Sequence, residues 1–142
     1  MGNIWILVAD SGVAHIYMTP HMKAELEMVQ SLRHEPSRLH PRELGTDVPG
    51  RVHDRFGPAR HSLDPAQGIK SEERHRFARE LADLLAESLR QKKFDRLVVI
   101  AAPAFLGTLR ECFSKQLAQT IVAEIPKDLT AQDAAAVKAH LP

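Results

Sequence analysis

Ile4-Trp5-Ile6-Leu7-Val8-Ala9 is an unbroken apolar run of six residues near the start of the chain, and Asp10-Ser11-Gly12 ends it. A short run rich in β-branched and aromatic residues is typical of a strand buried on both faces of a sheet. The three residues that follow are turn formers, and Gly12 is free to take a positive φ. The run therefore predicts a central strand whose chain turns back at Asp10.

The residues after this turn predict two more strands. Val13–Met18 is predominantly apolar and reads as the returning strand, which Thr19-Pro20-His21 ends. Glu25–Leu32 reads as a third strand with apolar positions on one face. Three short strands with tight connections favour an antiparallel meander.

The second half of the chain alternates between helical and strand patterns. Helical spacing predicts an amphipathic helix over about 71–92, with Ser71 as its N-cap, from the apolar positions Phe77, Leu81, Leu84, Leu85 and Leu89. Leu97–Ala102 is a second unbroken apolar run, so we expect a second strand covered on both faces.

The last part of the chain predicts two helices around one strand. A helix is expected from Pro103, with an apolar stripe through Leu106, Leu109, Phe113 and Leu117. A strand follows at residues 120–125, and Thr130 reads as the N-cap of a final helix. The order β-β-β-α-β-α-β-α predicts an α/β class, with one domain over residues 1–142 built on a mixed sheet.

Composition excludes several classes of protein. Nineteen Lys and Arg against eighteen Asp and Glu leave a net charge of +1, so affinity for nucleic acid must come from a local patch. Cys112 is the only cysteine, which excludes an internal disulfide and a four-cysteine zinc site. Because no apolar run is long enough for a membrane span or a secretion signal, we expect a cytoplasmic protein without membrane insertion.

Residues 33–69 interrupt the pattern with five prolines, four glycines and little apolar periodicity. Loops longer than about 15 residues in a compact domain are usually either functional or disordered. This segment holds six of the twelve arginines and no lysine, and arginine suits bidentate binding of phosphate or carboxylate. The candidate contacts to RNA or another partner are Arg38, Arg51, Arg55 and Arg60. The alternative is a solvated loop whose arginines pair with its own acidic residues.

Two further residues of this segment are expected to shape it. An Asp47–Arg51 pair across the Pro49-Gly50 turn would hold the segment in one form and leave Arg38 and Arg55 facing a partner. Asp47 and Gly50 are therefore candidate loop-structuring residues. The competing interpretation is that these side chains are exposed and independent, as surface charges usually are.

A few residues could bind a metal ion or an anion, but each also has a structural interpretation. His53, Asp54 and His61 are zinc-ligand types, but their spacing matches no metal-binding motif, so we expect no metal and no cofactor. Asp10 stands where ribonuclease H-like folds keep a metal-binding carboxylate, although a turn is the simpler interpretation. The helix start near Pro103 could hold an anion, but the favoured interpretation is that Gly107 allows close helix–sheet contact. Cys112 reads as a core or boundary residue.

Several strings make the chain similar to the bacterial host-attachment protein family, the proteins required for attachment to host cells. They are Trp5–Ser11, Pro49-Gly50-Arg51, Arg76–Ala82, Phe105–Arg110 and Lys127-Asp128-Leu129-Thr130. The family name describes a phenotype and not a molecular activity. The resemblance implies a non-enzymatic protein that binds RNA, the ribosome or a protein partner.

This family in turn resembles the middle domain of eukaryotic and archaeal peptide-chain release factors, which implies a ribonuclease H-like architecture. In those proteins a Gly-Gly-Gln loop reaches the peptidyl-transferase centre and precedes a helix that opens with an Arg-Phe-Ala-Arg-like string. Arg76-Phe77-Ala78-Arg79 fits that helix, but Lys70-Ser71-Glu72 occupies the Gly-Gly-Gln place and the nearest glutamine is Gln67. The resemblance implies contact with tRNA or the ribosome and, as an alternative function, peptidyl-tRNA hydrolysis through Gln67.

Overall fold

A mixed sheet of five strands forms the centre of the computed structural model, which describes residues 2–34 and 65–142 and, of residues 65–70, the backbone alone. The strands are β1 (Ile4–Ala9), β2 (Val13–Thr19), β3 (Glu27–Arg33), β4 (Arg96–Ala101) and β5 (Ile121–Ile125), in the order β3-β2-β1-β4-β5. β2 pairs antiparallel with β1 and β3, whereas β4 pairs parallel with β1 and β5. The α/β class and the antiparallel meander are confirmed.

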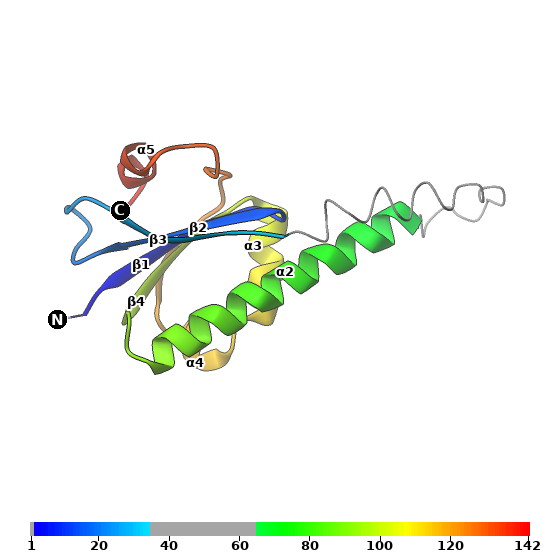
Figure 1. Ribbon diagram of the computed structural model, residues 1–142, viewed down its shortest axis with the longest axis horizontal. Coiled ribbons are helices and arrows are strands. Elements are labelled where there is room, and N and C mark those ends of the chain that lie inside the picture. The colour runs from blue at the N-terminus through cyan, green and yellow to red at the C-terminus, as the bar shows by residue number, and fades with distance from the viewer. Residues whose placement is uncertain (1, 35–64) are drawn as a thin grey trace.

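Helices cover both faces of this sheet (Figure 1). They are α2 (Pro65–Arg90), α3 (Pro103–Cys112), α4 (Lys115–Ala118) and α5 (Ala134–Ala139). α2 and α3 lie on one face, and the short α5 lies on the other (Figure 1). Among the described residues, no helix has the length and apolar character needed to cross a lipid bilayer.

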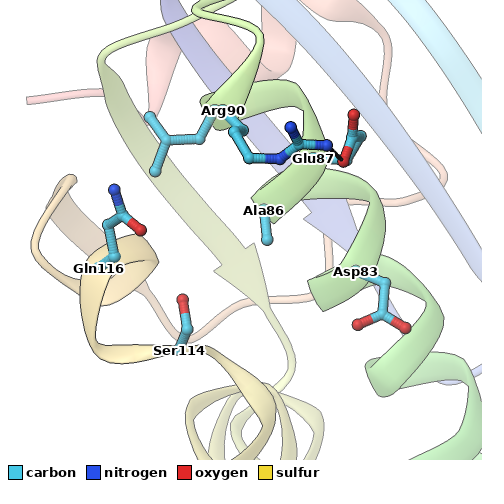
Figure 2. Close-up of a pocket in the computed structure, with 7 residues that line it drawn as sticks. Asp83, Ala86, Glu87, Arg90, Ser114 and Gln116 are labelled. Atoms are coloured by element: carbon cyan, nitrogen blue, oxygen red, sulfur yellow. Dashed lines mark hydrogen bonds and ion pairs between the residues drawn. The ribbon is translucent and has the colours of Figure 1, made fainter.

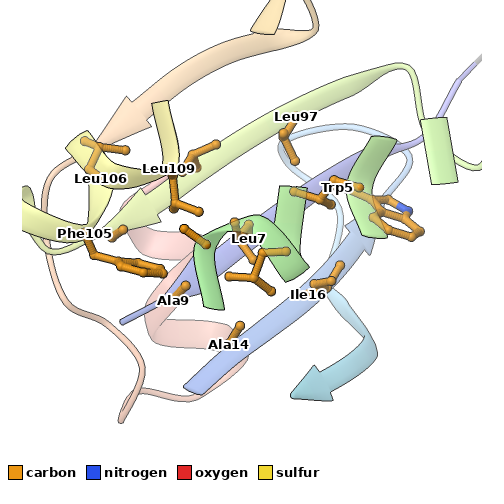
Figure 3. Close-up of a cluster of buried hydrophobic side chains, with 14 of the residues drawn as sticks. Trp5, Leu7, Ala9, Ala14, Ile16, Leu97, Phe105, Leu106 and Leu109 are labelled. Carbon is orange, nitrogen blue, oxygen red and sulfur yellow. The ribbon is translucent and has the colours of Figure 1, made fainter. Parts of the chain in front are cut away.

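The two central strands explain why the sheet needs both covers. Every residue of β1 is buried, and so is every residue of β4 after Arg96. Successive side chains of a strand point to opposite faces, so each of these strands contributes to two cores. Trp5, Leu7 and Ala9 enter the first core beneath α2 and α3, which Figure 3 shows, while Ile4, Ile6 and Val8 enter the second.

α2 begins six residues before the predicted start at Ser71, which is therefore an interior residue and not an N-cap. Pro65 is well suited to the first helical position because the missing N–H has no partner there. The early turns reach past the sheet (Figure 1), so no core imposes apolar spacing on them and the sequence signal is absent. The helix ends at Arg90, and Lys92 takes a left-handed φ of 63° while its N–H donates to the Leu89 carbonyl at 2.9 Å.

The helix predicted to run from Pro103 through Leu117 is interrupted. α3 ends at Cys112, Phe113 is extended, and the one-turn α4 follows. The Ser114 hydroxyl accepts a hydrogen bond from the Leu117 N–H at 3.1 Å, so serine acts as an N-cap for α4. Leu117 remains fully buried, because apolar spacing alone does not distinguish one helix from two.

In three further places the local structure differs from the simplest interpretation of the sequence. The third strand runs over Glu27–Arg33 and not Glu25–Leu32, and Leu26 packs against the second core from the preceding loop. Gly12 has no positive φ, because Asp10 holds the turn through side-chain hydrogen bonds. The N-cap of α5 is Asp133 and not Thr130, since Asp133 Oδ1 accepts the Ala136 N–H at 2.9 Å.

Both edge strands contain a β-bulge. Ile16 pairs with Gln30 and Tyr17 with Met28, so Val29 of β3 has no opposite residue. In the same way the pairing of β4 with β5 skips Val122. The two extra valines are 40% and 51% exposed, respectively.

Gly107 does not mediate a close helix–sheet contact. A Cβ built at this position would have no atom within 4 Å, so the interpretation favoured from the sequence is wrong. Gly107 lies in the interior of α3 and its side faces open space. Glycine there costs helix stability without making a contact that a larger residue would prevent.

Gly107→Ala is expected to raise the free energy of unfolding by about 0.5–1 kcal/mol, because alanine loses less backbone entropy in a helix interior. The measurement is urea unfolding followed by circular dichroism, with an increased midpoint and an unchanged denaturant slope. A lower midpoint would show that a partner surface in the chain excludes the added methyl group.

Candidate functional site

The carboxyl ends of β1, β4 and β5 meet at one edge of the sheet, where β2 also begins and β3 ends. In open α/β sheets, ligands usually bind outside the carboxyl ends of the strands at a change in strand order. β1 lies at such a change, because the chain adds β2 and β3 on one side of it and β4 and β5 on the other. We call this region the carboxyl edge.

Asp10 closes the turn between β1 and β2. Its Oδ1 atom accepts hydrogen bonds from the Gly12 and Val13 amides, each at 2.8 Å, and its own N–H donates to the Val13 carbonyl at 2.9 Å. Its Oδ2 atom lies 3.4 Å from the Thr130 hydroxyl. Both carboxylate oxygens therefore take part in the fold, which confirms the turn interpretation of Asp10-Ser11-Gly12.

His15 joins three elements near the carboxyl edge. Its Nε2 atom lies 3.2 Å from the Thr130 carbonyl oxygen, and its Nδ1 atom lies 2.8 Å from the Ser31 hydroxyl. A carbonyl oxygen only accepts, so Nε2 carries the hydrogen, and in the neutral ring Nδ1 accepts from Ser31. His15 thereby ties β2 both to β3 and to the chain that follows β5.

A buried histidine–carboxylate pair lies where β3 ends. His34 Nε2 is 2.5 Å from Glu73 Oε1 of α2, and the two residues are 2% and 7% exposed. The His34 ring also stacks on Phe77 with a centroid distance of 5.2 Å, and the His34 backbone N–H donates to the Gly12 carbonyl at 3.0 Å. Arg76 approaches the other oxygen of Glu73 at 3.6 Å. The pair fixes the end of β3 against α2.

The sequence interpretation missed this pair. It placed His34 in the interrupted segment of residues 33–69 and gave Glu73 no role in a site. One available signal was the four-residue spacing of Glu73 and Phe77, which puts both on neighbouring positions of one helix face. The pairing with His34 spans 39 positions and depends on the strand order.

The start of α3 also lies at the carboxyl edge. Ala102 occupies the N-cap without a side-chain hydrogen bond, and Pro103 follows it in the first turn. Phe105 anchors this turn by stacking on Phe77 of α2 at a centroid distance of 6.1 Å. Anion binding here is the less favoured of the two interpretations of the sequence, and it stays untested.

Cys112 is half-buried at the end of α3 and packs against the first core, as a boundary residue should. Burial raises the pKa of its thiol, Arg79 lowers it, and the Glu111 and Asp83 carboxylates raise it further. A raised pKa reduces the thiolate fraction near neutral pH, so Cys112 is a poor nucleophile.

A separate cleft of about 480 Å³ lies between the C-terminal half of α2 and α4 (Figure 2). Its polar side chains are largely used within the chain. Glu87 accepts hydrogen bonds from Arg90 and from Gln91, and Ser114 caps α4. None of the residues predicted to bind or catalyse lines this cleft.

Arg38, Arg51, Arg55 and Arg60, with the loop-structuring Asp47 and Gly50, lie outside the described residues, as do His53, Asp54 and His61. Gln67 lies in the first turn of α2. Within residues 2–34 and 65–142, no group of three or more His, Cys, Asp or Glu side chains is arranged to hold a metal ion.

The family described as "Protein required for attachment to host cells" matches residues 5–141. The chain belongs to this family. A comparison of this host-attachment protein with curated proteins finds no match. Nothing in the comparisons supports the resemblance to release factors.

Two solved structures are similar to parts of this chain, and the likeness in fold rests on the first of them. An archaeal actin homologue is similar with a TM-score of 0.51 and 17% identity, over 97% of this chain and 48% of that chain. The Ppx/GppA phosphatase of Aquifex aeolicus is similar with a TM-score of 0.36 and 14% identity, over 88% and 35% of the two chains. The host-attachment protein thus spans about half the length of the actin homologue.

Asp10→Ala is expected to lower the free energy of unfolding by about 1–3 kcal/mol, because it leaves the Gly12 and Val13 amides without their acceptor. Asp10→Asn retains an acceptor oxygen and should lose less than half as much. The control is Asp95→Ala, an exposed carboxylate, which should change stability by about 0.5 kcal/mol or less. Wild-type stability in Asp10→Ala would refute the structural role.

Proposed function

We propose that this host-attachment protein acts in the cytoplasm as a non-enzymatic binding protein. Its partner is RNA, and the contacts come from Arg38, Arg51, Arg55 and Arg60. The observation that carries the proposal is the buried His34–Glu73 pair, which anchors the chain at the start of the arginine-rich segment, residues 33–69.

A binding segment benefits when the residue at which it leaves the folded domain is held in one position. Removing one partner of a buried polar pair leaves the other unsatisfied in a low-dielectric site, so such pairs hold the two elements in a defined arrangement. Here the arrangement sets where the chain leaves β3 and where it meets α2. A segment with a defined base loses less conformational entropy on binding than one attached at random.

The chemistry of the segment favours a phosphate-bearing partner. Arginine presents a planar, permanently charged fork that pairs with two phosphate oxygens at once. The net charge of the whole chain is only +1, which gives little general attraction for polyanions, so binding would depend on these side chains. Both Asp10 oxygens are used in hydrogen bonds within the chain, so this carboxylate is not available as a catalytic group at the carboxyl edge. This supports a binding protein over an enzyme.

Replacing Arg38 and Arg55 together with alanine should weaken binding to a mixed-sequence single-stranded RNA. Each lost phosphate contact lowers the slope of log affinity against log salt by about 0.7 for single strands, so the slope should fall by about 1.4. Fluorescence anisotropy over a range of salt concentrations measures both quantities.

The matched control is Lys92→Ala with Arg96→Ala, which removes two exposed cations at the opposite end of the sheet and should leave the slope unchanged. An unchanged affinity and slope in the Arg38/Arg55 variant would exclude the segment from RNA binding. If the Arg38/Arg55 variant keeps the RNA slope but no longer retains a protein that the wild type captures from a cell extract, the partner is a protein and not RNA.

The alternative function is peptidyl-tRNA hydrolysis of the release-factor type through Gln67. In release factors the glutamine of the Gly-Gly-Gln string belongs to a loop before a helix. Gln67 and the Lys70-Ser71-Glu72 string both lie within the helix α2, which favours the binding function.

Incubation with stalled ribosomes that carry peptidyl-tRNA should give no release above the spontaneous rate, for the wild type and for Gln67→Ala alike. A puromycin reaction on the same ribosomes shows that the peptidyl-tRNA is reactive. Release by the wild type that disappears in Gln67→Ala would overturn the binding proposal in favour of hydrolysis.

A further inference from the structure

The two faces of the sheet are covered very unequally. On the first face, α2, α3 and α4 contribute eight buried apolar side chains: Phe77, Ala78, Leu81, Leu85, Phe105, Leu106, Leu109 and Leu117. On the second face, the chain after β5 contributes two buried side chains, Leu129 and Val137, with Ala134 and Leu141 partly buried beside them. We call this cover, residues 126–142, the strap.

Apart from the Lys127 amide, which donates back to the Ile125 carbonyl, hydrogen bonds attach the strap to the rest of the described chain at one residue. The Thr130 carbonyl oxygen accepts from His15 Nε2 at 3.2 Å, and the Thr130 hydroxyl lies 3.4 Å from Asp10 Oδ2. The same hydroxyl lies 2.7 Å from Asp128 Oδ1 within the strap. The single hydroxyl hydrogen of Thr130 is therefore shared between the carboxylates of Asp10 and Asp128. No ion pair among the described residues joins the strap to the sheet or to α2 and α3.

The other hydrogen bonds of the strap are local. The Gln132 amide donates to the Leu129 carbonyl, the Val137 amide to the Asp133 carbonyl, and the His140 amide to the Val137 carbonyl, each at 3.0 Å. α5 has six residues, which is far below the length of about 12–15 residues at which isolated helices become stable. The strap therefore keeps its structure through Thr130 and a few apolar contacts.

We propose that residues 126–142 form a detachable strap, latched at Thr130, that opens by local unfolding while the sheet and α2–α4 stay folded. Weakly held elements open with a smaller free energy than the global unfolding of the domain. Opening removes Leu129 and Val137 from the core that holds Ile4, Ile6 and Val8 of β1, while Met22 and Leu26 from the chain before β3 stay packed against that core. This device lies on a separate element from the arginine-rich segment and goes beyond the proposed RNA binding.

Native-state hydrogen exchange of the full chain tests the proposal without any substitution. In low urea, the Gln132, Val137 and His140 amides should exchange faster than the amides of β4, and their rates should respond weakly to urea. Local opening exposes little surface, whereas global unfolding exposes much and depends steeply on denaturant. Equal opening free energies and equal urea dependence for the strap and β4 would refute the proposal.

Three variants then test the latch. Thr130→Val removes the hydroxyl and should accelerate exchange of the strap amides about threefold to tenfold, the effect of losing a typical hydrogen bond, with β4 unchanged. Thr130→Ser keeps the hydroxyl and should stay within about twofold of the wild type. The matched control is Thr120→Val, whose hydroxyl donates to Leu117 at 2.6 Å outside the strap. An equal acceleration of strap and β4 amides in Thr130→Val would show that Thr130 supports the whole fold and not a latch.

Discussion

The burial of β1 and β4 on both faces is the constraint on which the rest of the structure depends. Their side chains are apolar at nearly every position, so neither face can be left in contact with water without a large loss of hydrophobic free energy. The first face meets this constraint with three helices, and the second with a short C-terminal cover together with Met22 and Leu26 from the chain before β3. The two halves of the core therefore differ in how many buried side chains cover them.

The same constraint shapes the carboxyl edge. Asp10 can turn the chain into β2 only if its carboxylate satisfies the amides of the turn, and the loop after β5 must cross this edge to reach the second face. His34 and Glu73 do the corresponding task where β3 meets α2. The polar side chains at this edge are thus used to join elements of the fold.

The sequence predicted what depends on local pattern. The runs around Leu7 and Val99 gave the central strands, and the adjacency of Asp10, Ser11 and Gly12 gave the turn, because each signal lies within a few residues. The start of α2 at Pro65 was missed since its first turns face no core. The break after Cys112 was missed because Leu117 keeps its apolar spacing on either side of it. The His34–Glu73 pair exists only after strand order brings distant residues together.

The bulges at Val29 and Val122 affect whether copies of this protein can associate through the edges of their sheets. An open strand edge is a template on which another chain can extend the sheet, and repeated extension produces aggregates. One unmatched residue on each edge distorts the regular row of donors and acceptors that such growth requires. The chain can thus expose two valines at the ends of a strongly apolar sheet and still resist stacking edge to edge in a crowded cell.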